Sequence, residues 1–248
     1  MDRPAIDLSA VSAVVFDSDG VVTDTARVHA AAWKHVFDAF LRGRCAPFDI
    51  SADYLRHVDG RPRLDGVRTF LAAREIELPE GAADDEPGAP TVHGLGLAKD
   101  RVFLEQVEKY GVAAFPSAVA LLHELRHRGC RTAAVTASVH GRKLITGAGV
   151  MHLFDLLVDG GDAALMNLPG KPDPALFLEA CRRLDLPAVR AAVVEAALPG
   201  LEAGKKGGFG QVVAVDRLGR AVELVASGAD VVVGDLGELT VRGRVPVS

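Results

Sequence analysis

Two aspartates with the spacing D-x-D-G follow an apolar run near the start of the chain. The run, residues 13–16, favours a buried strand, and Asp17-Ser18-Asp19-Gly20 is typical of the turn that leaves one. Because open parallel sheets bind ligands at the carboxyl ends of their strands, both carboxylates would face a site. Asp17 could then be a nucleophile and Asp19 a proton-transfer group beside a divalent cation. An acidic turn without chemistry is the alternative.

The continuation of this stretch favours the chemical interpretation. Residues 17–25 read D-S-D-G-V-V-T-D-T, and His29 and the pair Trp33-Lys34 follow. This pattern resembles the opening of the haloacid dehalogenase superfamily of phosphotransferases, in particular its β-phosphoglucomutase branch. The resemblance extends over nearly the whole chain. It implies an aspartyl-phosphate intermediate, Mg²⁺ as cofactor and a small phosphorylated sugar as substrate.

Three later stretches match further motifs of the superfamily. Thr136 follows an apolar run and corresponds to the hydroxyl residue that binds phosphoryl oxygens, although alone it would be read as an ordinary turn residue. Lys171 lies in the string G-K-P-D-P, where the proline restricts its backbone, and corresponds to a fixed ammonium that offsets negative charge. Glu195 occupies the place of the fourth motif, E-D-x-x-x-G. Ala196 replaces the second acid there, which is ordinarily a direct Mg²⁺ ligand.

The resemblance implies three sets of site residues. The catalytic set is Asp17, Asp19, Thr136 and Lys171. The metal ligands are Asp17, Asp19 and Glu195. The candidate substrate-binding residues are Thr25, His29, Trp33, Arg63, Lys99 and Ser138. Within this last set Arg63 corresponds to the cap arginine that the mutases present to the second phosphate, and an arginine fork suits phosphate oxygens. Lys99 corresponds to a cap lysine of the mutases, with a weaker local motif. Trp33 also falls on a helical apolar stripe, where packing is the simpler role.

Apolar runs alternate with helical patterns along most of the chain, which indicates parallel strands joined by crossovers. The pattern predicts helices over about 25–41, 117–128 and 141–148, and strands over 131–138, 154–158, 207–215 and 229–235. Residues 47–112 are mostly helical in pattern, with Gly94 to Arg101 leading into a helix. We expect an α/β fold, a doubly wound, mostly parallel Rossmann-like core over 1–26 and 114–248. A helical cap over 27–113 would be inserted into it.

Bulk composition limits the partners and the setting. The chain has 248 residues, is 49% hydrophobic and carries a net charge of −5, so no basic field favours nucleic acid. Cys45, Cys130 and Cys181 are odd in number and widely spaced, which fits a reducing cytoplasm. We expect no signal peptide and no membrane span, because the start lacks the required pattern and apolar runs are short. A monomer is the expected state.

Three functions remain open. The first is a mutase that converts β-glucose 1-phosphate to glucose 6-phosphate, which Arg63, Lys99 and His29 favour. The second is a phosphatase of a small phosphorylated metabolite, with water as acceptor. The third is a phosphosugar-binding protein impaired in catalysis, which Ala196 favours and the retained Asp19 opposes. Val139 and His140 replace polar substrate residues of the mutases, so a related sugar or cyclitol phosphate is a further candidate substrate.

Overall fold

The computed structural model describes residues 3–244, which form two compact units. The core unit contains Met1–Asp24 and Val112–Ser248, and the cap unit contains Thr25–Gly111. The boundaries expected from the sequence lie two residues further along the chain at both junctions. The cap is therefore inserted between the first strand of the main sheet and the remainder of the core.

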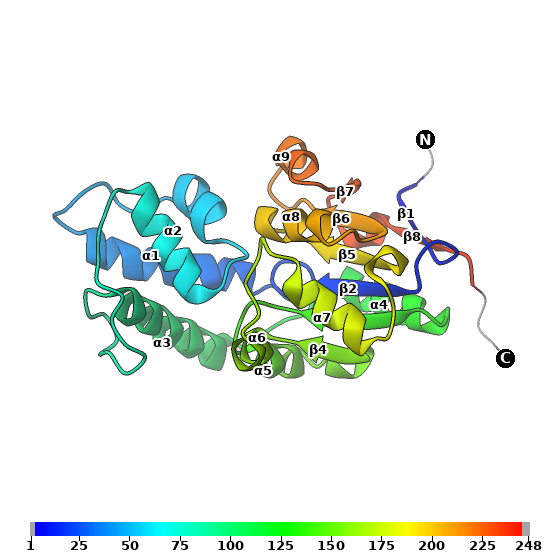
Figure 1. Ribbon diagram of the computed structural model, residues 1–248, viewed down its shortest axis with the longest axis horizontal. Helices are drawn as coiled ribbons and strands as arrows, with labels where there is room; N and C mark the ends of the chain where they lie inside the picture. Colours follow the sequence, from blue (N-terminus) through cyan, green and yellow to red (C-terminus); the bar gives the residue numbers. More distant parts are fainter. Residues whose placement is uncertain (1–2, 245–248) are drawn as a thin grey trace. The chain divides into compact units, whose positions relative to one another are not determined.

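The core is built on a sheet of six parallel strands (Figure 1). The order is β4-β3-β2-β5-β6-β7, so the chain order runs outward from β2 in both directions. The strands are β2 (Ala13–Asp17), β3 (Arg131–Val135), β4 (Leu156–Val158), β5 (Ala191–Glu195), β6 (Gln211–Val215) and β7 (Val231–Val233). Their continuous apolar sequences suit strands that are covered on both faces. The predicted doubly wound α/β fold is confirmed.

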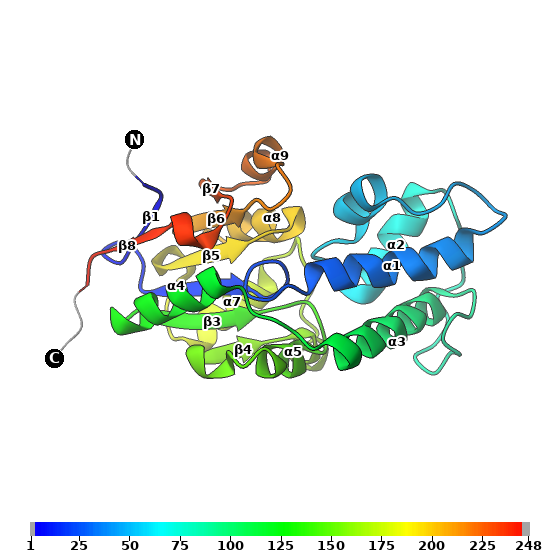
Figure 2. The ribbon, with the colours of Figure 1, turned by 180° about the vertical axis from the view of Figure 1, so that it is seen from behind.

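Helices cover both faces of this sheet (Figure 2). Val14 and Phe16 of β2 belong to a hydrophobic cluster on one face of the sheet. This cluster includes side chains of α4 (Pro116–His127) and α5 (Gly141–Gly147). Ala13 and Val15 point to the other face. The helices of that face are α7 (Ala175–Arg183), α8 (Leu198–Lys206) and α9 (Ala221–Ala226). Three short 3-10 segments, η2 (Met151–Leu153), η3 (Ala188–Arg190) and η4 (Leu236–Glu238), complete the connections.

A pair of short strands and a short helix are among the parts of the core that were not expected from the sequence. The strands β1 (Ala5–Asp7) and β8 (Thr240–Arg242) form a separate parallel pair, and three residues are too few to give a periodic signal. The helix α6 (Gly160–Met166) replaces a predicted loop. A capping box explains its start, because the Asp159 carboxylate accepts backbone N–H groups while Asp162 returns a bond to Asp159.

The cap is helical (Figure 1). Aromatic packing holds it together. Its elements are α1 (Ala26–Leu41), the π-helix η1 (Ile50–Val58), α2 (Arg63–Ala73) and α3 (Val92–Tyr110). The Phe37 ring lies 5.0 Å from Trp33, 4.9 Å from Phe48 and 4.1 Å from Phe70, centroid to centroid. Large buried rings of this kind contribute much of the apolar burial in a small unit.

Two glycines are placed differently from the expectation. Gly94 and Gly96 lie inside α3, which begins at Val92, rather than in a segment that leads into the helix. A side chain at Gly94 would come within 2.5 Å of the Ala89 carbonyl oxygen, so close packing requires glycine there. Among residues 3–244, no helix has both the length and the apolar character that crossing a bilayer requires.

Candidate active site

The ends of three neighbouring strands bring functional side chains to one edge of the sheet. Asp17 is in register with Val135, and Phe16 is in register with Val194. Thr136 follows Val135 at the end of β3, and Glu195 follows Val194 as the last residue of β5, so both lie beside Asp17 at this edge. All three side chains belong to buried residues. Parallel pairing thus produces the cluster of side chains that the D-x-D-G spacing predicts at this edge.

Lys171 joins two of these carboxylates. Its Nζ donates to Asp17 Oδ1 at 2.5 Å and also to Glu195 Oε1, from the loop between α6 and α7. Burial disfavours the charged ammonium, but the charges of Asp17 and Glu195 outweigh it and raise the pKa of Lys171. Burial, together with the negative charge of Glu195, raises the pKa of Asp17 well above its usual range, and Lys171 acts in the opposite direction. Lys171 is therefore a fixed positive charge at the strand ends.

A second set of hydrogen bonds orients Asp19 and Thr136. The Asp19 backbone N–H donates to Asp17 Oδ2 at 3.0 Å, so the two aspartates of the motif contact each other locally. Thr136 Oγ1 donates to Asp19 Oδ2 at 3.3 Å and accepts the Ser138 N–H at 3.1 Å. The structure therefore brings Asp17, Asp19, Thr136, Lys171 and Glu195 together. Their chemical roles stay predictions.

The turn between the two aspartates and the cap is closed by its own hydrogen bonds. Gly20 has φ 79°, a backbone conformation that favours glycine, and its N–H donates to the Thr23 carbonyl at 2.9 Å. Thr23 Oγ1 donates to the Ser18 carbonyl at 3.1 Å, and the two hydroxyls lie 3.3 Å apart. The buried hydroxyl of Ser18 thus has a polar neighbour although it lies between the two aspartates.

Glu195 has contacts that its predicted role as a metal ligand did not include. Its Oε2 accepts the N–H groups of Ala196 at 2.8 Å and Ala197 at 3.0 Å, immediately before α8. Its Oε1 accepts from Lys171. Gly200 makes room for the carboxylate, since a Cβ there would lie 1.8 Å from Glu195 Oε1. The side chain therefore holds Lys171 and accepts two backbone N–H groups of the turn before α8, and a role in metal binding stays a prediction.

The donors at this edge suit a magnesium ion that is held by few protein ligands. Mg²⁺ takes oxygen ligands and accepts one or two carboxylates when phosphate and water complete its shell. Each Asp17 oxygen accepts one of the hydrogen bonds above and retains a second lone pair. Asp17 and Asp19 fit such an ion, whereas Ala196 offers no side-chain oxygen. Within residues 3–244 no group of three acidic, histidine or cysteine side chains is arranged to bind a metal by itself.

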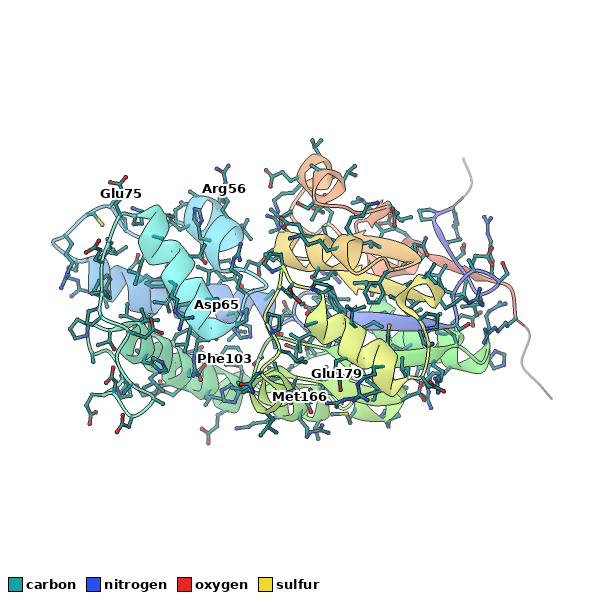
Figure 3. The ribbon with its side chains drawn as sticks, viewed as in Figure 1. Arg56, Asp65, Glu75, Phe103, Met166 and Glu179 are labelled. Carbon is teal, nitrogen blue, oxygen red and sulfur yellow. The ribbon has the colours of Figure 1, made fainter. Side chains whose placement is uncertain are left out.

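Two of the predicted substrate-binding residues of the cap contact each other. Lys99 Nζ lies 2.7 Å from His29 Nδ1, and Lys99 is a buried residue. The His29 ring stacks on Phe103, which Figure 3 labels on α3, with centroids 4.0 Å apart. Lys99 Nζ lies 4.4 Å from the Phe103 ring centroid. The Lys99 ammonium therefore contacts both the His29 imidazole and the face of the Phe103 ring.

The other predicted cap residues differ in their surroundings. Arg63 is the first residue of α2, although the glycines at 60 and 66 predict a turn there, and its guanidinium forms an ion pair with Asp100. Burial lowers the pKa of Arg63 below its usual range. Trp33 is 4% exposed and stacks on Phe37, so it is a packing residue of the cap. Thr25 is buried, and its carbonyl accepts the N–H of the fourth residue after it, at the start of α1.

Two features of the core site were missed by sequence reasoning. Gly141 lets the loop after β3 close, because a Cβ there would lie 2.3 Å from Thr136 Cγ2. Arg217, in the loop after β6, donates to the Gly20 carbonyl at 3.0 Å. The position of Arg217 at a strand end was a usable signal. For Gly141 the chain offered no local signal, because the contact depends on how the loop folds back.

Comparisons with known proteins agree with this geometry. A family model described as haloacid dehalogenase-like hydrolase matches residues 11–208. The chain is 41% identical to the beta-phosphoglucomutase of Mycobacterium tuberculosis (strain CDC 1551 / Oshkosh) over 239 residues, which cover 92% of this chain and 91% of the relative. It is 28% identical to the validoxylamine A 7'-phosphate phosphatase of Streptomyces hygroscopicus subsp. limoneus, over 79% of this chain and 81% of the relative. A crystal structure of beta-phosphoglucomutase from Clostridium difficile has the same fold, with TM-score 0.72, 20% identity and 93% of each chain covered.

Proposed function

Because the chain is an enzyme of the haloacid dehalogenase-like hydrolase family, we propose that it transfers the phosphoryl group of a small sugar phosphate through Asp17. The observation that carries the proposal is the buried Asp17, in contact with Lys171 and with the Asp19 backbone at the strand ends. The first candidate reaction is that of a β-phosphoglucomutase, β-glucose 1-phosphate to glucose 6-phosphate. The 41% identity to the mycobacterial mutase supports this choice.

The residues divide the work of phosphoryl transfer between them. An oxygen of Asp17 attacks phosphorus in line, the bond to the sugar oxygen breaks, and Asp17 becomes an aspartyl phosphate. Asp19 gives its proton to the departing oxygen and later removes one from the acceptor hydroxyl. Lys171 offsets negative charge on the nucleophile and the phosphoryl oxygens, and the Thr136 hydroxyl binds one of those oxygens. Mg²⁺, which members of this superfamily generally use, would be held by the Asp17 carboxylate and the Asp19 backbone carbonyl and would compensate phosphoryl charge.

A phosphatase is the second candidate, and the state of Arg63 favours it. A mutase must bind both ends of a bisphosphorylated sugar, and Arg63 and Lys99 are the proposed cations for the second phosphate. The Arg63 guanidinium already forms an ion pair with Asp100, so a phosphate would compete with that carboxylate. A phosphatase substrate carries one phosphate, and its phosphoryl group passes to water. No second phosphate then competes with Asp100 for Arg63. The retained Asp19 argues against a protein that only binds phosphosugars, because binding needs no proton-transfer group.

Product analysis distinguishes these reactions. The protein is incubated with β-glucose 1-phosphate, a bisphosphate primer and Mg²⁺, and the products are separated. Glucose 6-phosphate supports the mutase, whereas free phosphate supports the phosphatase. If neither product forms from this sugar phosphate or from p-nitrophenyl phosphate, the proposal of phosphoryl transfer is wrong.

The Asp17→Asn variant tests the nucleophile in the same assay. An amide cannot form the aspartyl phosphate, so the expected result is no transfer on either substrate. Asp173→Asn is the matched control, because Asp173 is an acid of the G-K-P-D-P string whose side chain accepts the N–H of the neighbouring Ala175. A fully active Asp17→Asn variant would refute the proposed role.

A further inference from the structure

The turn that carries Asp19 is tied from outside by an arginine of a distant loop. Arg217 Nε donates to the Gly20 carbonyl oxygen at 3.0 Å, from the loop between β6 and α9. Gly20 is the residue after Asp19. The carbonyl belongs to the peptide that leaves Gly20, while the N–H of the peptide that enters it donates to Thr23. Both peptides that flank Gly20 therefore have a defined hydrogen-bond partner.

Further contacts fix the guanidinium of Arg217 itself. Its Cζ lies 3.7 Å from the centroid of the Phe115 ring, a distance at which the cation stacks on the aromatic face. Arg217 Nη1 lies 3.4 Å from Asp235 Oδ2, which also accepts the Ser117 hydroxyl at 2.8 Å. The backbone N–H of Phe115 donates to the Val22 carbonyl at 2.9 Å. Arg217 and Phe115 thus hold two points of the same turn.

This arrangement has a consequence for proton transfer. Gly20 has positive φ and no side chain, so the backbone alone does not favour one orientation of its peptides. Asp19 must reach the departing oxygen to give its proton, and small displacements of a catalytic group reduce the rate strongly. A charged, planar donor suits the task of fixing a carbonyl, since it cannot lose its charge and keeps its geometry.

We propose that Arg217 is a positioning residue, which holds the Gly20 turn so that Asp19 is placed for proton transfer. The inference rests on the proposed function, because it assigns to Asp19 the role of acid and base. Arg217 acts through the turn and does not touch substrate in this account. Its loss should therefore affect the step that needs a proton more than substrate binding or the attack of Asp17.

Two substrates separate these steps in the Arg217→Gln variant. The sugar oxygen of β-glucose 1-phosphate would leave as a strongly basic alkoxide, so it needs a proton. The p-nitrophenolate ion is a weak base and leaves without one. We expect kcat on the sugar phosphate to fall about tenfold or more, a part of what general acid catalysis contributes. The KM, and the rate at which the first p-nitrophenolate is released in a single turnover, should change by less than about threefold, because the site that binds phosphate is intact and this release needs no proton. Equal losses on the two substrates would overturn the proposal.

Hydrogen exchange gives a readout that does not depend on activity. The amides of Gly20 to Thr23 should exchange faster in Arg217→Gln than in the native protein. Arg220→Gln is the matched control, since Arg220 lies in the same loop and its Nη1 pairs with Glu223. It should change neither the exchange nor the ratio of the two activities. Unchanged exchange in Arg217→Gln would show that Arg217 does not hold the Gly20 turn, whether or not the wild type is active. A wild type without phosphoryl transfer would refute the proposed function separately. If Arg217→Gln does not fold, Arg217→Lys replaces it with the same readouts.

Discussion

The buried ammonium of Lys171 contacts Asp17 and Glu195, so one positive charge offsets two negative charges. Removing one member of such a buried ion network leaves an uncompensated charge, which is more costly than the loss of an exposed pair. Glu195 is also bound by the Ala196 and Ala197 amides, so its carboxylate is held in place. Of the acids named as metal ligands, Asp17 then has the side chain that suits Mg²⁺, whereas Asp19 can offer its backbone carbonyl and keep its carboxyl for proton transfer.

The Ala196→Asp variant tests how much Mg²⁺ affinity this chain loses by having alanine in place of the second acid of the fourth motif. We expect Mg²⁺ to bind at least about tenfold more tightly, equivalent to about 1.4 kcal/mol, because a carboxylate is added beside Asp17 and Glu195. Isothermal titration calorimetry with Mg²⁺ measures this without turnover. Ala196→Asn is the matched control, because it adds similar bulk without charge and should change the affinity little. Equal affinities of native protein and Ala196→Asp would contradict the placement of position 196 at the metal.

At the scale of elements, the site depends on how closely α8 approaches the end of β5. Gly200 lies in the first turn of α8, and the Glu195 carboxylate occupies the space that a Cβ would take. The Glu195 side chain has no exposed surface and is held by Lys171 and by two amides. It cannot move aside without losing those contacts. Strand, turn and helix therefore act as one unit in positioning Lys171.

The Gly200→Ala variant should lose both stability and activity. The added methyl group displaces Glu195, and overpacking of this kind costs about 1–3 kcal/mol. Gly147→Ala is the control, since nothing lies within 4 Å of its Cβ position at the end of α5. That variant should be equally stable or more stable, by up to about 1 kcal/mol. Denaturant unfolding of both variants measures the difference, and similar stabilities would argue against the close contact.

An ion network on α7 makes a prediction about pH. Hydrogen bonds from Arg182, and then from Arg183, lower the pKa of Glu179 from 4.5 to about 2 (Figure 3 labels Glu179). A lowered folded-state pKa stabilises the fold above pH 4.5, and this contribution is lost as the pH falls from 4.5 toward 2. Glu179→Gln should cost about 1 kcal/mol at pH 7. The difference from the native protein should shrink at pH 3.

Unfolding curves at pH 7 and pH 3 check this expectation. Glu202→Gln is the control, because Glu202 forms a more exposed pair with Lys206 on α8. It should change stability little at either pH. A difference between native protein and Glu179→Gln that is the same at both pH values would show that the ion network does not act through the charge of Glu179.

At the scale of the whole molecule, the residues named for one reaction are divided between two units. Asp17, Asp19 and Lys171 belong to the core, whereas Arg63 and Lys99 belong to the cap. In the proposed mechanism the core set suffices for attack on one phosphate. A mutase in addition requires binding of the second phosphate, which the proposed function assigns to the cap. The contributions of the two units can therefore be tested separately. Hydrolysis of a simple phosphate ester involves one phosphate, whereas the mutase reaction passes through a sugar with two.

The Arg63→Ala variant makes this test. We expect turnover of β-glucose 1-phosphate to fall about 10–100-fold, the value of a hydrogen bond to a charged group, with a much smaller effect on p-nitrophenyl phosphate hydrolysis. Arg68→Ala is the matched control on the same helix, because Arg68 pairs with Asp65 and Glu80 at the surface. Steady-state rates on both substrates decide the matter. Equal losses on both would remove Arg63 from the second-phosphate site.

Much of this protein follows from local sequence. The resemblance to the haloacid dehalogenase superfamily is confirmed, and so are the parallel doubly wound core and the assignment as an enzyme of that family. Short β-branched runs and amphipathic stripes determine strands and helices, because these patterns act over a few neighbouring residues. The D-x-D-G spacing placed two carboxylates at a strand end for the same reason. The roles of individual site residues stay predictions.

Tertiary structure decided which side chains meet. Lys171 and Asp17 are 154 residues apart in the chain and bond to each other, Glu195 also binds Lys171, and Arg217 reaches the Gly20 turn. The pairing of β1 with β8 joins the two ends of the described chain in the same way. Such partners depend on the packing of whole elements, so no local pattern specifies them. The sequence determined which chemical groups are available. The fold determined which of them form an ion pair or a hydrogen bond with one another.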